Sequence, residues 1–231
     1  MTVVAANLQQ INEQISEACA RSGRHVSEVT MIAVTKYVSV ERAKQALACG
    51  IHHLAENRRE GLLEKQERIA RDQAIWHLIG TLQTRKVKDV VNSIDYFHAL
   101  DRLKLAEEIQ KRRQRSKLKC MIELNISGEE TKHGLAPEEL DPFLTHLAAF
   151  PAIEVVGLMT MAPNTDDSEQ IRSVFRRLRE LRGRVQDKLL TYAPCTELSM
   201  GMSHDYPIAV EEGATFVRIG TALVGNEQKG S

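Results

Sequence analysis

The sequence predicts one α/β domain, a single (β/α)8 barrel of the TIM type with an extra helix at its N-terminus. Short apolar runs alternate eight times with longer amphipathic or charged runs, which is the pattern of βαβ units in a parallel sheet. The length of 231 residues fits one such barrel. A doubly wound open sheet is the competing prediction, but no Gly-x-Gly-x-x-Gly turn follows the first apolar run.

An amphipathic helix is expected first. Its apolar residues fall at helical spacing: Leu8, Ile11, Ile15 and Ala18. Gly23 ends this pattern. We therefore assign residues 1–24 to the extra helix and about 29–225 to the barrel. No linker rich in proline, glycine or serine separates them, so residues 1–231 are predicted to form one domain.

The eight strand–helix units follow in order. The apolar runs predicted to be strands are 29–36, 53–57, 74–80, 96–100, 119–125, 153–161, 196–201 and 215–221. The runs predicted to be helices are 39–50, 58–70, 84–91, 102–113, a segment after Pro137, 167–189 and 206–212. Ser39 and Asp101 are expected to cap two of these helices. Beyond the eighth strand we expect only a short tail.

Composition excludes several classes of function. Lys plus Arg equal Asp plus Glu at 31 each, so no net field favours nucleic acid or a membrane. The arginine-rich segments 111–115 and 172–184 are interpreted as solvated helix faces. No apolar run approaches the roughly 20 residues that cross a bilayer, and no secretory signal opens the chain. Four scattered cysteines without a pairing motif then favour a reducing, cytoplasmic setting.

Polar side chains occur at almost every predicted strand end, where barrels of this type carry their chemistry. They are Thr35, Lys36, Glu56, Asn57, His77, Asp101, Glu123, Asn125, Thr160, Ser199, Arg218 and Thr221. Lys36 alone could be a solvated strand end. A lysine partly desolvated at the barrel mouth is instead a nucleophile toward carbonyls, and its polar neighbours favour that role.

Other members of this ring also have structural interpretations. Asn57 could cap the helix that follows it, or its amide could bind a ligand oxygen. His77 lies between apolar neighbours, so we expect it to line the pocket and not to transfer protons. The methionines near the strand ends are expected to pack the barrel and its rim: Met159, Met161, Met200 and Met202.

Two glycine-containing turns follow the last two strands. Ser199-Met-Gly-Met-Ser203 leads into a helix, and Arg218-Ile-Gly-Thr221 ends the eighth strand. Each could be an ordinary turn. Phosphate sites in these barrels frequently lie after strands seven and eight, however, and glycine permits close backbone approach. A phosphate here and a lysine on the first strand would suit a phosphorylated aldehyde, of which pyridoxal 5′-phosphate (PLP) is the obvious example.

Six motifs carry a family resemblance. They are Ala33-Val-Thr-Lys36, Ala55-Glu-Asn57, His77-Leu-Ile-Gly80, Gly157-Leu-Met-Thr-Met161, Leu198-Ser-Met-Gly-Met-Ser203-His-Asp205 and Val217-Arg-Ile-Gly-Thr221. From about residue 29 to 225 the chain resembles the PLP homeostasis protein family (YggS/PROSC type). The resemblance implies a fold like the N-terminal barrel of bacterial alanine racemase, without the second domain of that enzyme.

The resemblance also implies roles for residues. Lys36 would hold PLP as a Schiff base (an aldimine), Asn57 would lie near the phenolic oxygen, and Arg218 would face the pyridine nitrogen. The phosphate would be held by Ser199, Gly201, Gly220 and Thr221. The whole predicted cofactor-binding set is Lys36, Asn57, His77, Met159, Ser199, Gly201, Met202, Arg218, Gly220 and Thr221. No catalytic residue and no metal ligand is predicted.

An arginine at the pyridine nitrogen favours the unprotonated ring, because a guanidinium only donates hydrogen bonds. The resemblance therefore implies a PLP-binding homeostasis protein that holds and delivers the cofactor without established catalysis, with effects on amino-acid and keto-acid balance. A PLP-dependent racemase is the alternative, although few residues remain after Thr221 for a second domain. A lysine-dependent aldolase is the third reading, but such barrels usually bring the lysine from a later strand.

The expected partners are PLP and, beyond it, recipient apo-enzymes or a regulatory protein that the sequence does not identify. A monomer is expected.

Overall fold

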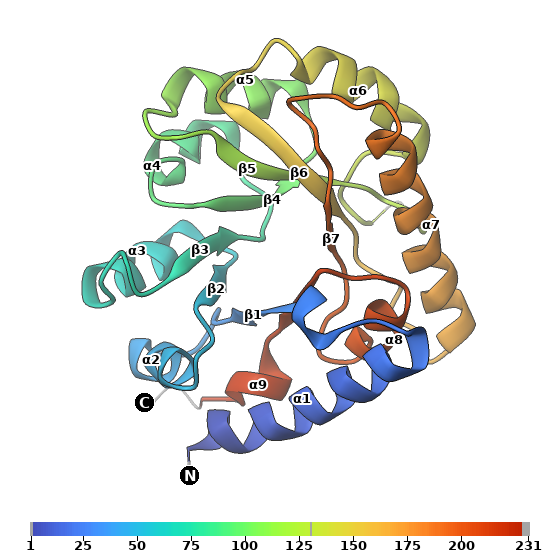
Figure 1. The fold of residues 1–231 in the computed structure, drawn as a ribbon. Coiled ribbons are helices and arrows are strands. Elements are labelled where there is room, and N and C mark those ends of the chain that lie inside the picture. The colour runs from blue at the N-terminus through green and yellow to red at the C-terminus, as the bar shows by residue number, and fades with distance from the viewer. Residues whose placement is uncertain (1, 130, 228–231) are drawn as a thin grey trace.

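A closed parallel barrel forms the body of the computed structural model, which describes residues 2–129 and 131–227. Within them the strands follow the order β1-β2-β3-β4-β5-β6-β7-β8, and β8 pairs with β1 (Figure 1). The predicted barrel is thereby confirmed. The strands are β1 (Thr30–Val34), β2 (His53–Glu56), β3 (Ile75–Leu78), β4 (Tyr96–Leu100), β5 (Leu118–Glu123), β6 (Ile153–Met159), β7 (Glu197–Ser199) and β8 (Phe216–Ile219).

Helices surround this barrel on the outside, as Figure 1 shows. The α-helices are α1 (Val3–Ser22), α2 (Val40–Ala48), α3 (Arg59–Arg68), α4 (Val87–Val90), α5 (Leu103–Arg112), α6 (Leu140–Leu147), α7 (Ser168–Gln186), α8 (Tyr206–Glu211) and α9 (Thr221–Val224). Short 3-10 helices are η1 (Val26–Glu28), η2 (Thr84–Lys86) and η3 (Pro137–Glu139). Because the helices cover the outer faces of the strands and the barrel interior covers the inner faces, most strand residues are apolar and buried.

The extra N-terminal helix packs along the outside of the last units of the barrel. Asn7 donates to the carbonyl of Leu223 at 3.0 Å, and Arg24 donates to the carbonyl of Val210 at 2.7 Å. Figure 1 shows α1 running beside α8 and α9. Gly23 ends the helix with a φ of 68°, a conformation that glycine adopts without strain. The prediction of this helix is confirmed.

One predicted cap is confirmed and the other is wrong. Ser39 accepts the backbone N–H of Arg42 at 3.1 Å and begins α2. Asp101 does not cap α5, whose flanking residue is Arg102 without a side-chain cap. The Asp101 carboxylate instead pairs with the guanidinium of Arg102, so the ion pair replaces the cap.

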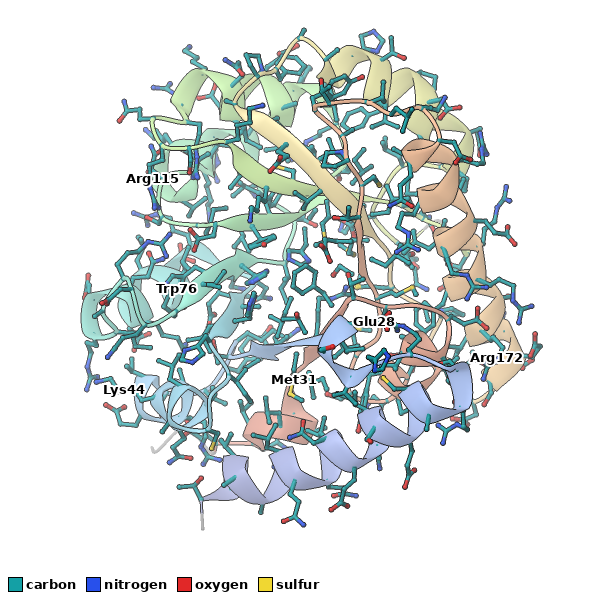
Figure 2. The ribbon with its side chains drawn as sticks, in the orientation of Figure 1. Glu28, Met31, Lys44, Trp76, Arg115 and Arg172 are labelled. Atoms are coloured by element: carbon teal, nitrogen blue, oxygen red, sulfur yellow. The ribbon has the colours of Figure 1, made fainter. Side chains whose placement is uncertain are left out.

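Three further features differ from the prediction. The segment 84–91 starts as the 3-10 helix η2, and only Val87–Val90 is α-helical. A short helix, α9, follows β8 where only a tail was expected. The arginine-rich helix is not simply a solvated face: Arg172, at the α8 side of α7 in Figure 2, pairs with Glu211 at 2.5 Å and with Glu212 at 3.2 Å.

Within the described ranges, no helix has the length and apolar character needed to cross a bilayer. The four cysteines are free thiols.

Candidate functional site

Lys36 lies on the turn that follows β1, two residues beyond the end of the strand. Its side chain is exposed, with Nζ 5.6 Å from the centre of the Tyr37 ring. Tyr37 has a φ of 71°, which is uncommon for a residue other than glycine and marks a constrained turn. The lysine is therefore presented to solvent at the carboxyl end of the first strand.

The turn after β8 faces the same space. Lys36, Tyr37, Gly220 and Thr221 line one cavity of about 110 Å³. Lys36 and Tyr37 also line a neighbouring cavity of about 650 Å³, together with Asn57. The structure thus brings together four of the predicted site residues: Lys36 after β1, Asn57 after β2, and Gly220 and Thr221 after β8.

The two predicted phosphate glycines have different surroundings. Gly201 has a φ of 91°, and a Cβ built on it would lie 2.5 Å from the Cβ of Ala209, so it lets α8 pack against the turn. A Cβ on Gly220 would lie 3.7 Å from the Cβ of Val34, an ordinary contact. Packing therefore explains Gly201, whereas a Cβ at Gly220 would make only ordinary van der Waals contacts.

Sequence reasoning left Ser203 out of the predicted set. Its hydroxyl accepts the backbone N–H of Ala222 at 3.4 Å, at the start of α9. Ser199, which was predicted to hold phosphate, is fully buried, and both of its described side-chain contacts lie inside the barrel. The Ser-Met-Gly-Met-Ser motif offers two serine hydroxyls, so the sequence indicates that either could hold the phosphate. Which one faces the turn after β8 depends on the direction of each side chain.

Arg218 lies inside the barrel. Its guanidinium donates to Ser199 Oγ at 2.5 Å and to the Thr160 carbonyl at 3.1 Å. Burial lowers the pKa of Arg218 to about 10, while the carboxylates of Asp205 and Glu123 oppose this shift, so the group is charged at neutral pH. Within residues 2–129 and 131–227 it forms no salt bridge. It is a buried cation held by neutral acceptors.

Glu123, the last residue of β5, shares this space. Burial raises the pKa of Glu123 to about 7, and the nearby Asp101 adds to the shift while Arg218 opposes it. Asp205 behaves similarly: burial raises its pKa, although its carboxylate accepts the backbone N–H of Met202 at 2.5 Å. Burial thus raises the pKa of both acids, and neither carboxylate forms a salt bridge with Arg218 among the described residues.

A series of histidines continues inward from Ser199. Its hydroxyl lies 2.8 Å from His98 Nδ1, His98 Nε2 lies 2.8 Å from His77 Nδ1, and His77 Nε2 lies 2.9 Å from His53 Nδ1. Burial holds the pKa of His77 and His98 well below the usual range, so both rings are neutral. The cofactor contact of His77 stays a prediction. No local pattern pointed to His98 or His53, because strand pairing alone brings them together.

A second buried charge belongs to Glu56 at the end of β2. Its carboxylate pairs with Lys65 Nζ at 3.0 Å and accepts the hydroxyl of Thr35 at 2.7 Å. Gly61 permits this arrangement, since a Cβ there would lie 2.6 Å from the carboxylate. Glu56 and Lys65 line the same cavity of about 650 Å³ as Lys36 and Asn57, but each side chain is only 3% exposed and its charge is already paired.

The remaining predicted residues lie at the rim. Met159 is buried at the end of β6, beside Ser199 in register, and Met202 is 36% exposed. The Asn57 backbone is pressed against Gly80, where a Cβ would lie 2.4 Å from its carbonyl oxygen. No cluster of three or more His, Cys, Asp or Glu side chains suited to a metal ion occurs in the part of the chain that the structure describes.

Fold and site together define a class: a barrel of the alanine racemase N-terminal type with a lysine after its first strand. The family model for the N-terminal domain of alanine racemase matches residues 6–228. The pyridoxal phosphate homeostasis protein of Aquifex aeolicus (strain VF5) is 41% identical over 223 residues, which cover 96% of this chain and 97% of that protein. The chain belongs to the pyridoxal phosphate homeostasis protein family.

Solved structures agree with this membership. PipY of Synechococcus elongatus PCC7942, with PLP bound, is 30% identical with a TM-score of 0.82, covering 96% of this chain and 100% of that chain. Alanine racemase of Clostridium difficile 630 has a TM-score of 0.73 at 15% identity, covering 95% of this chain and 56% of that chain. The likeness to the racemase concerns the fold alone.

Proposed function

We propose that this chain binds PLP covalently through Lys36 and serves PLP homeostasis as a carrier or regulator. The observation that carries the proposal is the shared cavity: Lys36 and the Gly220–Thr221 turn line the same space. A cofactor with an aldehyde at one side and a phosphate at the other matches an amine facing an open glycine turn. Membership of the homeostasis family and the PLP bound to PipY support the same proposal.

The proposed roles combine the family resemblance with the positions of the residues around the cavities. Lys36 Nζ would condense with the aldehyde carbon, releasing one water, and Asn57 would approach the phenolic oxygen. Gly220 and Thr221 would receive the phosphate. Ser203, adjacent to them through its bond to Ala222, is a stronger phosphate candidate than the buried Ser199.

Arg218 would face the pyridine nitrogen. Bound PLP would supply an electron-withdrawing ring, and its strength as an electron sink depends on protonation of that nitrogen. Because the guanidinium is charged and can only donate, Arg218 would hold the nitrogen unprotonated. The proposed function is therefore to hold and hand over the cofactor and not to turn over amino acids.

Four further parts of the proposal concern the protein as a whole. We propose one domain, with residues 1–24 as the extra helix and about 29–225 as the barrel. We also propose a monomer, a cytoplasmic location, and recipient apo-enzymes or a regulatory protein as partners.

The test is a titration of the purified protein with PLP, followed by absorption spectroscopy. A new visible band, lost in Lys36→Ala and retained in Lys44→Ala, is expected. Lys44 is the matched control because it is an exposed lysine on α2 (Figure 2). Borohydride reduction and peptide mapping should place the adduct on Lys36. An adduct on another lysine overturns the site, and turnover of alanine at enzyme-like rates overturns the carrier role.

A further inference from the structure

A continuous column of hydrogen bonds crosses the interior of the barrel. It starts at Arg218 on β8 and passes through Ser199, His98 and His77 to His53, the first residue of β2. The distances along it are 2.5, 2.8, 2.8 and 2.9 Å. Except for His53, which is half-buried, its members are buried.

The far end of this column reaches another cavity. His53 lines a space of about 630 Å³ together with Thr30 and Ile75, the first residues of β1 and β3. This cavity therefore lies at the amino ends of the strands, opposite the mouth that holds Lys36. The column connects the two ends of the barrel.

The direction of the hydrogen bonds follows from Arg218. A guanidinium has donors only, so Ser199 Oγ accepts from it. Ser199 Oγ has one hydrogen, and His98 Nδ1 is its other described partner. If His98 Nδ1 donated to Ser199 Oγ instead, the hydrogen of the Ser199 hydroxyl would be buried without an acceptor among the described residues. Such unpaired buried donors are rare in folded proteins.

The remaining protons are then determined one after another. Because a neutral imidazole has one donor and one acceptor nitrogen, His98 carries its proton on Nε2 and donates to His77 Nδ1. His77 likewise carries its proton on Nε2 and donates to His53 Nδ1. Each bond in the column has one donor and one acceptor, so the arrangement leaves no buried nitrogen of His77 or His98 without a partner.

We propose that Arg218 imposes this single proton arrangement, and that Ser199, His98 and His77 are positioning residues that hold the guanidinium toward the pyridine nitrogen of PLP. The second half of the proposal rests on the proposed function. Ser199 is central because it is the link between the guanidinium and the histidines. We therefore assign Ser199 to holding the Arg218 guanidinium and not to binding the phosphate.

The first experiment uses the full-length protein without PLP and so does not depend on the cofactor. Long-range ¹H–¹⁵N correlation spectra of labelled histidine report which ring nitrogen carries the proton. Near neutral pH we expect His77 and His98 to be neutral, with the proton on Nε2. A proton on Nδ1 of His98 in the wild-type protein overturns the proposal and needs no variant.

Variants at position 199 then test the link. Ser199→Ala removes the donor to His98 Nδ1, so His98 and His77 should shift to mixed tautomers, whereas Ser199→Thr keeps a hydroxyl and should keep the wild-type spectrum. Thr215→Val is the control, since it removes another hydroxyl that bonds β7, at 2.8 Å to the N–H of Leu198, outside the column. Unchanged tautomers in Ser199→Ala overturn the proposal.

The second experiment measures PLP affinity by the visible absorption band. Loss of the hydrogen bond that holds Arg218 should weaken binding about tenfold in Ser199→Ala, with Ser199→Thr and Thr215→Val close to the wild type. Wild-type affinity in Ser199→Ala overturns the positioning role. If the wild-type protein itself binds no PLP, the proposed function fails, and the histidine spectra still decide the proton arrangement.

Discussion

Glu56 and Arg218 are both buried near the carboxyl ends of the strands, and their surroundings differ. On the β2 side, Glu56 is paired with Lys65 at 3.0 Å, and both side chains are 3% exposed. On the β8 side, the partners to which Arg218 donates among residues 2–129 and 131–227 are neutral oxygens, those of Ser199 and Thr160. One charge is neutralised by the protein itself, and the other is not.

This difference separates a buried charge with a structural role from one that is available to a ligand. A buried charge is costly unless it is paired. Glu56 has its partner, so its ion pair stabilises the contact between β2 and α3. Arg218 has only hydrogen bonds and two carboxyls, Glu123 and Asp205, with raised pKa values. A cation left in this way is suited to a ligand that brings its own acceptor.

The largest expected effect tests the paired charge. Lys65→Met leaves Glu56 buried without its partner, which should lower the free energy of unfolding by about 3–5 kcal/mol, measured by urea denaturation. The double variant Glu56→Gln/Lys65→Met should recover most of this loss, and Lys44→Met should show none. A loss below about 1 kcal/mol in Lys65→Met would mean that the pair behaves like an exposed one.

Removing the unpaired charge should affect PLP binding more than stability. Arg218→Met removes a cation that has no ion-pair partner among the described residues, so stability should fall less than in Lys65→Met. PLP affinity should fall by about 10- to 100-fold, the equivalent of a charge-assisted hydrogen bond, as measured by spectroscopic titration. If Arg218→Met and Lys65→Met lowered the free energy of unfolding equally, the proposed difference between the paired and the unpaired charge would be wrong.

The two glycine turns sharpen the comparison on the β8 side. Gly201→Ala places a Cβ against Ala209 at a positive φ, which should cost about 1–3 kcal/mol of unfolding free energy. Gly220→Ala has room for its Cβ, so unfolding should be almost unchanged while PLP affinity falls. Thermal and urea unfolding of both variants, with PLP titration, separate these outcomes. Wild-type affinity in Gly220→Ala would remove this turn from the proposed site.

The smallest effect concerns Glu123 and pH. Since burial raises the pKa of Glu123 to about 7 in the folded chain, its protonation stabilises the fold. This contribution is fully present below the ordinary carboxyl range and is lost as pH rises through about 7. Unfolding free energy should fall by about 1–2 kcal/mol from about pH 5 to about pH 8. Glu123→Gln should flatten that part of the profile, and an unchanged slope would contradict the assignment.

Much of the fold and part of the site were predictable from the sequence. Alternating strand and helix periods identified the eight units, because side-chain spacing depends on local geometry. Local motifs also identified Lys36 and the turn at Gly220. Asp101 was misassigned as a cap because a neighbouring arginine takes its carboxylate, and α9 was missed because four residues are too few to show a helical period.

By itself, the sequence determined the barrel, the lysine after the first strand and the glycine turn after the last, since these are properties of short segments. Only the tertiary structure decided that Ser199 faces Arg218 and that Ser203 lies at α9. It also decided that His53, His77 and His98 meet inside the barrel. These contacts join residues on separate strands, and their side-chain directions depend on barrel closure, which no local pattern encodes.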